Sequence, residues 1–157
     1  MEDLEAELLP YENMIANGLA SVMVAHLQFP AVDAEPASFS VRWIQQELRG
    51  RLGFSGAVFS DDLSMGGAAC AGSPAERARR AMAAGCDVLP LCNDRLAVLE
   101  TLEELAGKLD PVSQVRLIPL HGKPMPKRVE LLASTRWQKC RAAIDHCHDT
   151  PALRLDA

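Results

Sequence analysis

Three short apolar runs, each followed by a helical pattern, constrain the fold of this 157-residue chain more than any other feature. The runs lie at residues 19–26, 56–60 and 87–92, and they are apolar on both faces instead of alternating. Strands of this kind are typical of a parallel sheet that is covered by helices. Parallel neighbours need a crossover between them, and helical segments separate the runs. The chain is therefore predicted to be an α/β protein with a parallel sheet.

The helical segments carry recognisable start and stop signals. Ser40 and Asn93 stand where N-caps belong, and Ser73 to Glu76 has the Ser, Pro and Glu spacing of a capping box. Gly85 is a typical helix stop. Helices are expected over residues 4–16, 41–50, 73–84, 96–109 and 127–146.

Other features of the pattern are less regular. Residues 28–39 contain two prolines and show no period, so they are predicted to form a loop. Pro90 weakens the third strand, because proline cannot donate to a ladder. The helix after it has an apolar stripe, which predicts its buried face: Leu96, Leu99, Leu102, Leu105 and Leu109.

Composition argues against several classes of protein. A net charge of −5 disfavours a nucleic-acid partner, because phosphate binding needs a basic face. No window is apolar for long enough to form a membrane helix, and the acidic start does not resemble a signal peptide. Five cysteines, an odd number without regular spacing, do not form a disulfide framework. A cytoplasmic protein is expected.

Metal and nucleotide sites are also poorly supported. Cys140 lies near His146, Cys147 and His148, but three adjacent ligand-type residues point in different directions on a helix, so a solvated helix end is favoured over a zinc site. Gly66-Gly67 lacks the surrounding pattern of a phosphate-binding loop. No metal and no cofactor are expected.

The ends of the predicted strands carry the side chains that could take part in catalysis or binding. Functional groups of parallel α/β folds gather at the carboxyl ends of strands, which here bear His26, Asp61 with Asp62, and Cys92 with Asn93. Each has a structural alternative as well. Either aspartate could cap the turn that follows, His26 could be a hydrogen-bonded structural histidine, and Asn93 could be a helix cap.

The segment from Gly53 to Met65, GFSGAVFSDDLSM, resembles the nucleophile segment of family 3 glycoside hydrolases. It is especially similar to the bacterial cytosolic β-N-acetylglucosaminidases of peptidoglycan recycling, which have LGF-x-G, a strand and then FSDDLSM. The resemblance extends upstream through residues 18–40 and downstream through residues 76–93 and 134–137, so it covers nearly the whole chain.

This resemblance implies a retaining β-N-acetylhexosaminidase in which Asp61 is the nucleophile, Asp62 a capping or supporting carboxylate, and a saccharide containing N-acetylglucosamine the substrate. His26 lies on the rim beside them, where a substrate-side or orienting role is expected, and it is assigned here to substrate binding. The family's acid/base histidine lies in a loop similar to Lys-His-Phe-Pro-Gly-His-Gly, and the present sequence has no such string.

The family fold is a (β/α)8 barrel, which needs about 200 residues or more. The resemblance therefore implies that residues 1–157 are one partial barrel domain, its C-terminal portion of about three strand–helix units, with a helical tail from about residue 111. Such a portion exposes sheet edges, so a barrel-completing chain or self-association is expected, with little hydrolysis by the chain alone. The alternative is a non-catalytic α/β fragment that binds sugar weakly or docks onto another protein.

Overall fold

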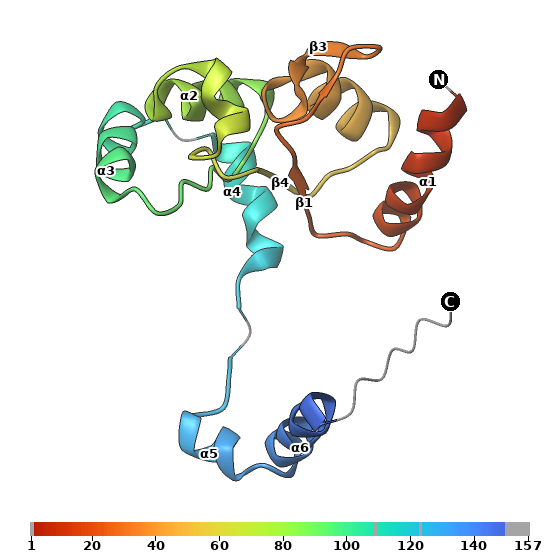
Figure 1. Ribbon diagram of the computed structural model, residues 1–157, viewed down its shortest axis with the longest axis vertical. Coiled ribbons are helices and arrows are strands. Elements are labelled where there is room, and N and C mark those ends of the chain that lie inside the picture. The colour runs from red at the N-terminus through yellow and green to blue at the C-terminus, as the bar shows by residue number, and fades with distance from the viewer. Residues whose placement is uncertain (1, 109, 123, 150–157) are drawn as a thin grey trace. The chain divides into compact units, whose positions relative to one another are not determined.

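The structure is a computed structural model that describes residues 2–108, 110–122 and 124–149. The chain forms two compact units, Met1–His121 and Gly122–Ala157. The first unit contains all the strands of the described residues (Figure 1). His26 and Asp61 also fall within its bounds. This unit therefore positions the candidate site.

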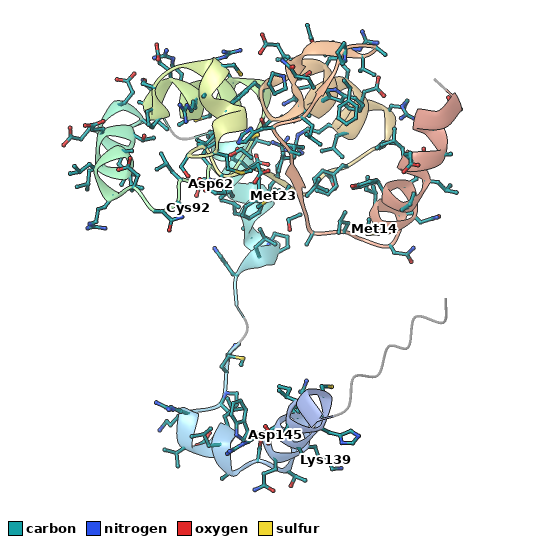
Figure 2. The ribbon with its side chains drawn as sticks, viewed as in Figure 1. Met14, Met23, Asp62, Cys92, Lys139 and Asp145 are labelled. Atoms are coloured by element: carbon teal, nitrogen blue, oxygen red, sulfur yellow. The ribbon has the colours of Figure 1, made fainter. Side chains whose placement is uncertain are left out.

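Two of the three predicted strands pair directly. β1 (Ser21–Val24) lies parallel to β4 (Ala57–Ser60), as the apolar runs predict. On one face of this pair Val58 and Ser60 are fully buried, whereas on the other Met23 is 58% exposed (Figure 2). The face with Val58 and Ser60 is thus covered, whereas the opposite face is exposed at Met23 and buried at Ala57.

The third predicted strand, residues 87–92, is reduced to one parallel bridge between Phe59 and Val88. The carbonyl of Val88 accepts the Ser60 N–H at 3.0 Å, and the carbonyl of Pro90 accepts the Leu63 N–H at 2.9 Å. Pro90 has no N–H to return, so a regular ladder cannot continue through it. The segment follows β4 in parallel but is too irregular to form a strand.

The prediction of a loop over residues 28–39 is wrong. β2 (Gln28–Phe29) and β3 (Asp33–Pro36) form a short antiparallel hairpin with an irregular register, followed by the 3-10 helix η1 (Ala37–Phe39). The Val32 N–H donates to the Phe29 carbonyl at 2.8 Å within the turn. So few paired residues leave no periodic signal in the sequence.

Helix η2 (Arg42–Arg51) is a π-helix that begins where the sequence predicts. The Ser40 hydroxyl accepts the Trp43 N–H at 3.0 Å, so it satisfies an N–H at the helix start. Ile44 and Leu48 are both buried, as expected for the apolar face.

Helix α2 (Pro74–Ala84) confirms the predicted capping signals. The Ser73 hydroxyl accepts the Glu76 N–H, and the Glu76 carboxylate accepts the Ser73 N–H in return. Gly85 ends the helix in the left-handed region at φ 114°, which glycine adopts without a Cβ penalty. Three alanines form the buried face of this helix: Ala78, Ala81 and Ala84.

Helix α3 (Arg95–Glu104) differs from its prediction in two respects. Asp94, not Asn93, is the N-cap, and its carboxylate accepts the Ala97 N–H at 3.0 Å. The buried face consists of Ala97 and Thr101, whereas most of the predicted leucine stripe is exposed, at 73% for Leu96, 45% for Leu99 and 63% for Leu102. Leu105 packs partly against the core, and Leu109 lies outside the described residues. Helix α3 packs against α2, and the face that it buries carries small side chains.

The remaining elements of the first unit surround the sheet. They are α1 (Glu2–Ala16), which contains Pro10, the 3-10 helix η3 (Gly66–Ala71), α4 (Pro111–Leu117) and the 3-10 helix η4 (Ile118–Leu120). The largest fully buried apolar side chains of the core are Ile44, Leu63 and Val58, which come from three different segments. The core therefore lies between the sheet and the helices that follow it.

The second unit contains α5 (Arg128–Ala133) and α6 (Thr135–Asp149) where one helix is predicted. Ser134 separates them: its hydroxyl donates to the Leu131 carbonyl at 2.7 Å and accepts the Trp137 N–H at 3.1 Å. A serine that caps a new helix interrupts the old one. Among the described residues of the whole chain, no helix is both long and apolar enough to cross a membrane.

Candidate active site

The carboxyl ends of the strands bring the predicted chemical residues together. The Asp61 N–H donates to the Val24 carbonyl at 3.0 Å, which continues the β1–β4 ladder to the nucleophile candidate. The Asp62 side chain reaches the Cys92 N–H at 3.0 Å (Figure 2). A ring nitrogen of His26 lies 3.0 Å from the Asp62 carbonyl oxygen. Three segments far apart in the sequence therefore meet at Asp61-Asp62.

The Asp61 carboxylate accepts few hydrogen bonds from the described residues. Its Oδ1 accepts the Asp62 N–H at 2.9 Å, and no other hydrogen bond to this carboxylate comes from a described residue. The side chain is neither buried nor fully exposed. None of the ion pairs among the described residues involves it. One oxygen is thus oriented by the backbone and the other is available.

Asp62 is engaged on both oxygens. Its Oδ1 accepts the N–H groups of Ser64 and Cys92 at 2.9 and 3.0 Å, and its Oδ2 accepts the Ser64 hydroxyl at 2.8 Å. Burial raises the pKa of this carboxyl, but these hydrogen bonds to the charged form outweigh burial and hold the pKa below its usual value. Asp62 therefore caps the turn and ties it to the third segment. Burial, followed by the nearby Asp62 charge, raises the pKa of the Cys92 thiol.

His26 is held on three sides. Its Nδ1 lies 2.5 Å from the Ser38 hydroxyl, its Nε2 lies 3.0 Å from the Asp62 carbonyl oxygen, and its ring stacks on Phe39 with centroids 5.4 Å apart. Gly67 passes so close that a Cβ there would lie 3.0 Å from the His26 Cβ. The ring position is therefore set by hydrogen bonds and packing together.

A buried ionic cluster surrounds Asp87, and the sequence pattern did not predict it. Asp87 is 1% exposed, and its carboxylate accepts from Arg49 at 2.8 Å, Arg116 at 3.0 Å, the Ser113 hydroxyl at 2.6 Å and the Val58 N–H at 2.7 Å. It stands at the start of the third segment, at the opposite ends of the strands from Asp61. The sequence signal that could have predicted this cluster is the charge of Asp87 at the start of the apolar run 87–92.

Asp87 should make the stability of the first unit sensitive to acid. Burial raises the pKa of this carboxyl, but the hydrogen bonds from Ser113, Val58 and Arg116 and the charge of Arg49 outweigh it, so the folded-state pKa lies below the ordinary value. Its stabilisation is then complete above the unfolded carboxyl pKa of about 3.9 and is lost as pH falls through the folded pKa. Urea midpoints measured from pH 7 downward should decrease below about pH 4.5. The decrease of the midpoint with falling pH should be smaller for Asp87→Asn than for the unchanged chain. Equal decreases in the two proteins would show that Asp87 is not the source of the acid sensitivity.

The described residues offer no metal site. In the part of the chain that the structure covers, no three His, Cys, Asp or Glu side chains gather closely enough to hold an ion. The side chain of His148 lies outside the described part. All five cysteines are free thiols.

Parallel strands linked through helices, with a carboxylate at the carboxyl end of one strand, define an α/β domain. The sequence pattern described as "Glycosyl hydrolase family 3 N terminal domain" matches residues 2–118. This chain belongs to glycosyl hydrolase family 3, and it has the α/β fold of that family's barrel domain.

Relatives and solved structures agree with this assignment. The chain is 46% identical to a β-hexosaminidase from Thioalkalivibrio sulfidiphilus over 154 residues, which cover 98% of this chain and 44% of that protein. It superposes on native NagZ from Neisseria gonorrhoeae with a TM-score of 0.72 and 32% identity, covering 92% of this chain and 41% of NagZ. The same NagZ in complex with N-trifluoroacetyl-D-glucosamine gives a TM-score of 0.73 at 32% identity, with 92% and 42% covered. The chain thus spans about two fifths of the length of the relatives it matches.

Proposed function

We propose that this chain supplies the nucleophile, Asp61, of a retaining β-N-acetylhexosaminidase that removes terminal β-linked N-acetylglucosamine. The observation that carries the proposal is the Asp61 carboxylate at the end of β4, with one oxygen oriented by the Asp62 N–H and the other available. Membership of the family and β-hexosaminidase relatives support this activity. The NagZ complex with N-trifluoroacetyl-D-glucosamine supports a saccharide that contains N-acetylglucosamine.

The chemistry proceeds in two displacements. An Asp61 oxygen bonds to the anomeric carbon while the bond from that carbon to the leaving oxygen breaks, and the leaving oxygen takes a proton. Water then loses a proton, its oxygen replaces Asp61 on the anomeric carbon, and the carboxylate is released with net retention. Both steps need an acid/base group, and the sequence lacks the Lys-His-Phe-Pro-Gly-His-Gly string. We place that group on a polypeptide segment outside these 157 residues.

The open edge of β1 is where we expect that segment to add. Among the described residues, β1 pairs on one side only, with β4. Beside it lies an apolar groove of about 250 Å³, lined by residues that include Tyr11, Met23, Leu27 and Trp43. Met23 and Leu27 are 58% and 59% exposed, so the lining of this groove leaves large apolar side chains uncovered. A further parallel strand would pair with the β1 edge and cover these side chains.

Complementation tests this arrangement. The chain is produced together with the part of the Thioalkalivibrio sulfidiphilus β-hexosaminidase that it does not match, and hydrolysis of 4-nitrophenyl β-N-acetylglucosaminide is measured. We expect hydrolysis by the mixture to exceed that of either part alone by about a hundredfold or more, the usual contribution of acid/base catalysis. Comparable hydrolysis by the chain alone would contradict the proposal. A stable dimer that binds sugar without hydrolysis would instead favour a non-catalytic binding module.

A reagent that needs no acid catalyst tests the nucleophile directly. In a 5-fluoro β-N-acetylglucosaminyl fluoride the anomeric carbon loses fluoride, which departs with its electron pair and without a proton, while the second fluorine slows hydrolysis of the glycosyl-enzyme. The purified chain should gain the mass of one glycosyl group, and peptide mapping should place it on Asp61. A chain that stays unlabelled, or one labelled at another residue, would refute the assignment.

We also propose a cytoplasmic location and a role in peptidoglycan recycling, in keeping with the sequence resemblance. The five free thiols support a reducing compartment, where disulfides rarely persist. Fractionation of producing cells, with a cytoplasmic and a periplasmic marker enzyme as references, would test the location.

A further inference from the structure

His26 contacts the site through its ring nitrogens, and both of them already have partners within the protein. Nε2 lies 3.0 Å from the carbonyl oxygen of Asp62, and Nδ1 lies 2.5 Å from the hydroxyl of Ser38. Ser38 is fully buried, so its end of this chain of hydrogen bonds is anchored in the core. The stacked Phe39 ring keeps the imidazole plane in place.

The partners determine where the imidazole carries its proton. A backbone carbonyl can only accept, so a hydrogen bond to Asp62 requires a proton on Nε2. If the ring carries that single proton, Nδ1 accepts a hydrogen bond from the Ser38 hydroxyl. In this tautomer neither nitrogen presents a free lone pair to substrate or water. His26 is therefore poorly placed to serve as the acid/base group or to accept a sugar hydroxyl.

We infer that His26 is a positioning residue, which fixes the Asp61-Asp62 backbone through the Asp62 carbonyl and so aims the Asp61 carboxylate. This inference rests on the proposed role of Asp61. Three further hydrogen bonds restrain Asp61: its N–H donates to the Val24 carbonyl, its carbonyl accepts the Ser60 hydroxyl, and its Oδ1 accepts the Asp62 N–H. A rotation of the Asp61–Asp62 peptide would break the bond to Oδ1. The His26 bond to the Asp62 carbonyl holds the adjoining Asp62–Leu63 peptide, so it restrains the turn on the other side of Asp62.

Imidazole NMR tests the hydrogen bonding independently of any sugar chemistry. With ¹⁵N-labelled histidine in the full chain, His26 should appear as the Nε2–H tautomer, with a slowly exchanging proton. His121, which is exposed, should show the usual mixture with rapid exchange. A His26 resonance pattern of the Nδ1–H tautomer would overturn the inference, because Nε2 could then not donate to Asp62.

Labelling by the 5-fluoro glycosyl fluoride tests the positioning role. His26→Phe keeps a ring on Phe39 but loses both hydrogen bonds, and it should slow labelling of Asp61 about 10- to 100-fold, the cost of a misplaced reacting group. His26→Gln, whose amide can still donate to Asp62, should recover most of the rate, and His121→Phe should leave it unchanged.

The pH dependence of the labelling rate distinguishes a positioning role of His26 from a role in proton transfer. The His26→Phe rate should be lower by the same factor at every pH, whereas loss of one limb of the profile would indicate an acid/base role and overturn the inference. A labelling rate in His26→Phe equal to that of the unchanged chain would also overturn the inference. A wild-type chain that shows the Nε2–H tautomer but is not labelled would refute the proposed function of Asp61, and with it the role given to His26.

Discussion

Replacing Asp61 by asparagine is expected to slow labelling by the 5-fluoro glycosyl fluoride about a thousandfold or more, because a neutral amide is a poor nucleophile. The change is nearly isosteric, and an amide oxygen can still accept the Asp62 N–H that Oδ1 accepts now. The backbone of the site should therefore stay in place. Time courses of intact mass, compared with the wild-type chain, measure the effect.

Two other asparagine variants make this result specific. Asp94→Asn replaces an exposed N-cap by another good cap, so it should label at the wild-type rate. Asp62→Asn removes the neighbouring carboxylate, which accepts three hydrogen bonds within the protein. If labelling were lost in Asp62→Asn and retained in Asp61→Asn, Asp62 would be the nucleophile. Equal loss in Asp94→Asn would indicate misfolding instead of chemistry.

Asp87→Ala is expected to destabilise the first unit by about 3–5 kcal/mol, the usual cost of removing one partner from a buried ionic cluster. The arginines left behind are nearly buried, at 9% exposure for Arg49 and 22% for Arg116. The Val58 N–H would also lose its partner at 2.7 Å, and this N–H belongs to β4. A loss of this size is a large part of the stability of most domains.

Urea denaturation, followed by circular dichroism, measures the loss for Asp87→Ala. Asp94→Asn again serves as the matched control and should change the free energy of unfolding by less than about 0.5 kcal/mol. If Asp87→Ala is too unstable to purify, it is replaced by Arg116→Met, which removes only one partner of the cluster and should cost less. Stability equal to wild type in both Asp87→Ala and Arg116→Met would contradict the importance of this cluster.

Local signals in the sequence predicted local structure well. The Ser73 to Glu76 capping box and the left-handed Gly85 both occur as expected, because each depends on residues within one turn of helix. Paired strands and an α/β fold were also predicted, since apolar runs report burial directly. The hairpin at Gln28–Pro36 was missed because its few pairs carry no period.

The leucine stripe shows where periodicity alone fails. Leu96, Leu99 and Leu102 recur at helical spacing, yet α3 buries Ala97 and Thr101. Helix α3 packs against α2, and its surroundings in the fold decide which of its faces is buried. A pattern within one helix contains no information about the surface against which it packs.

By itself the sequence determined the family, the parallel strands, and the place of Asp61 at the end of a strand. Only the tertiary structure decided the hydrogen-bond partners. The Asp62 carboxylate accepts the Cys92 N–H, and a ring nitrogen of His26 contacts the Asp62 carbonyl. The Asp87 carboxylate pairs with both Arg49 and Arg116. These partners are separated by 29 to 38 residues along the chain. Strand and helix signals extend over a few residues, whereas contacts at such separations depend on how the whole sheet and its helices pack.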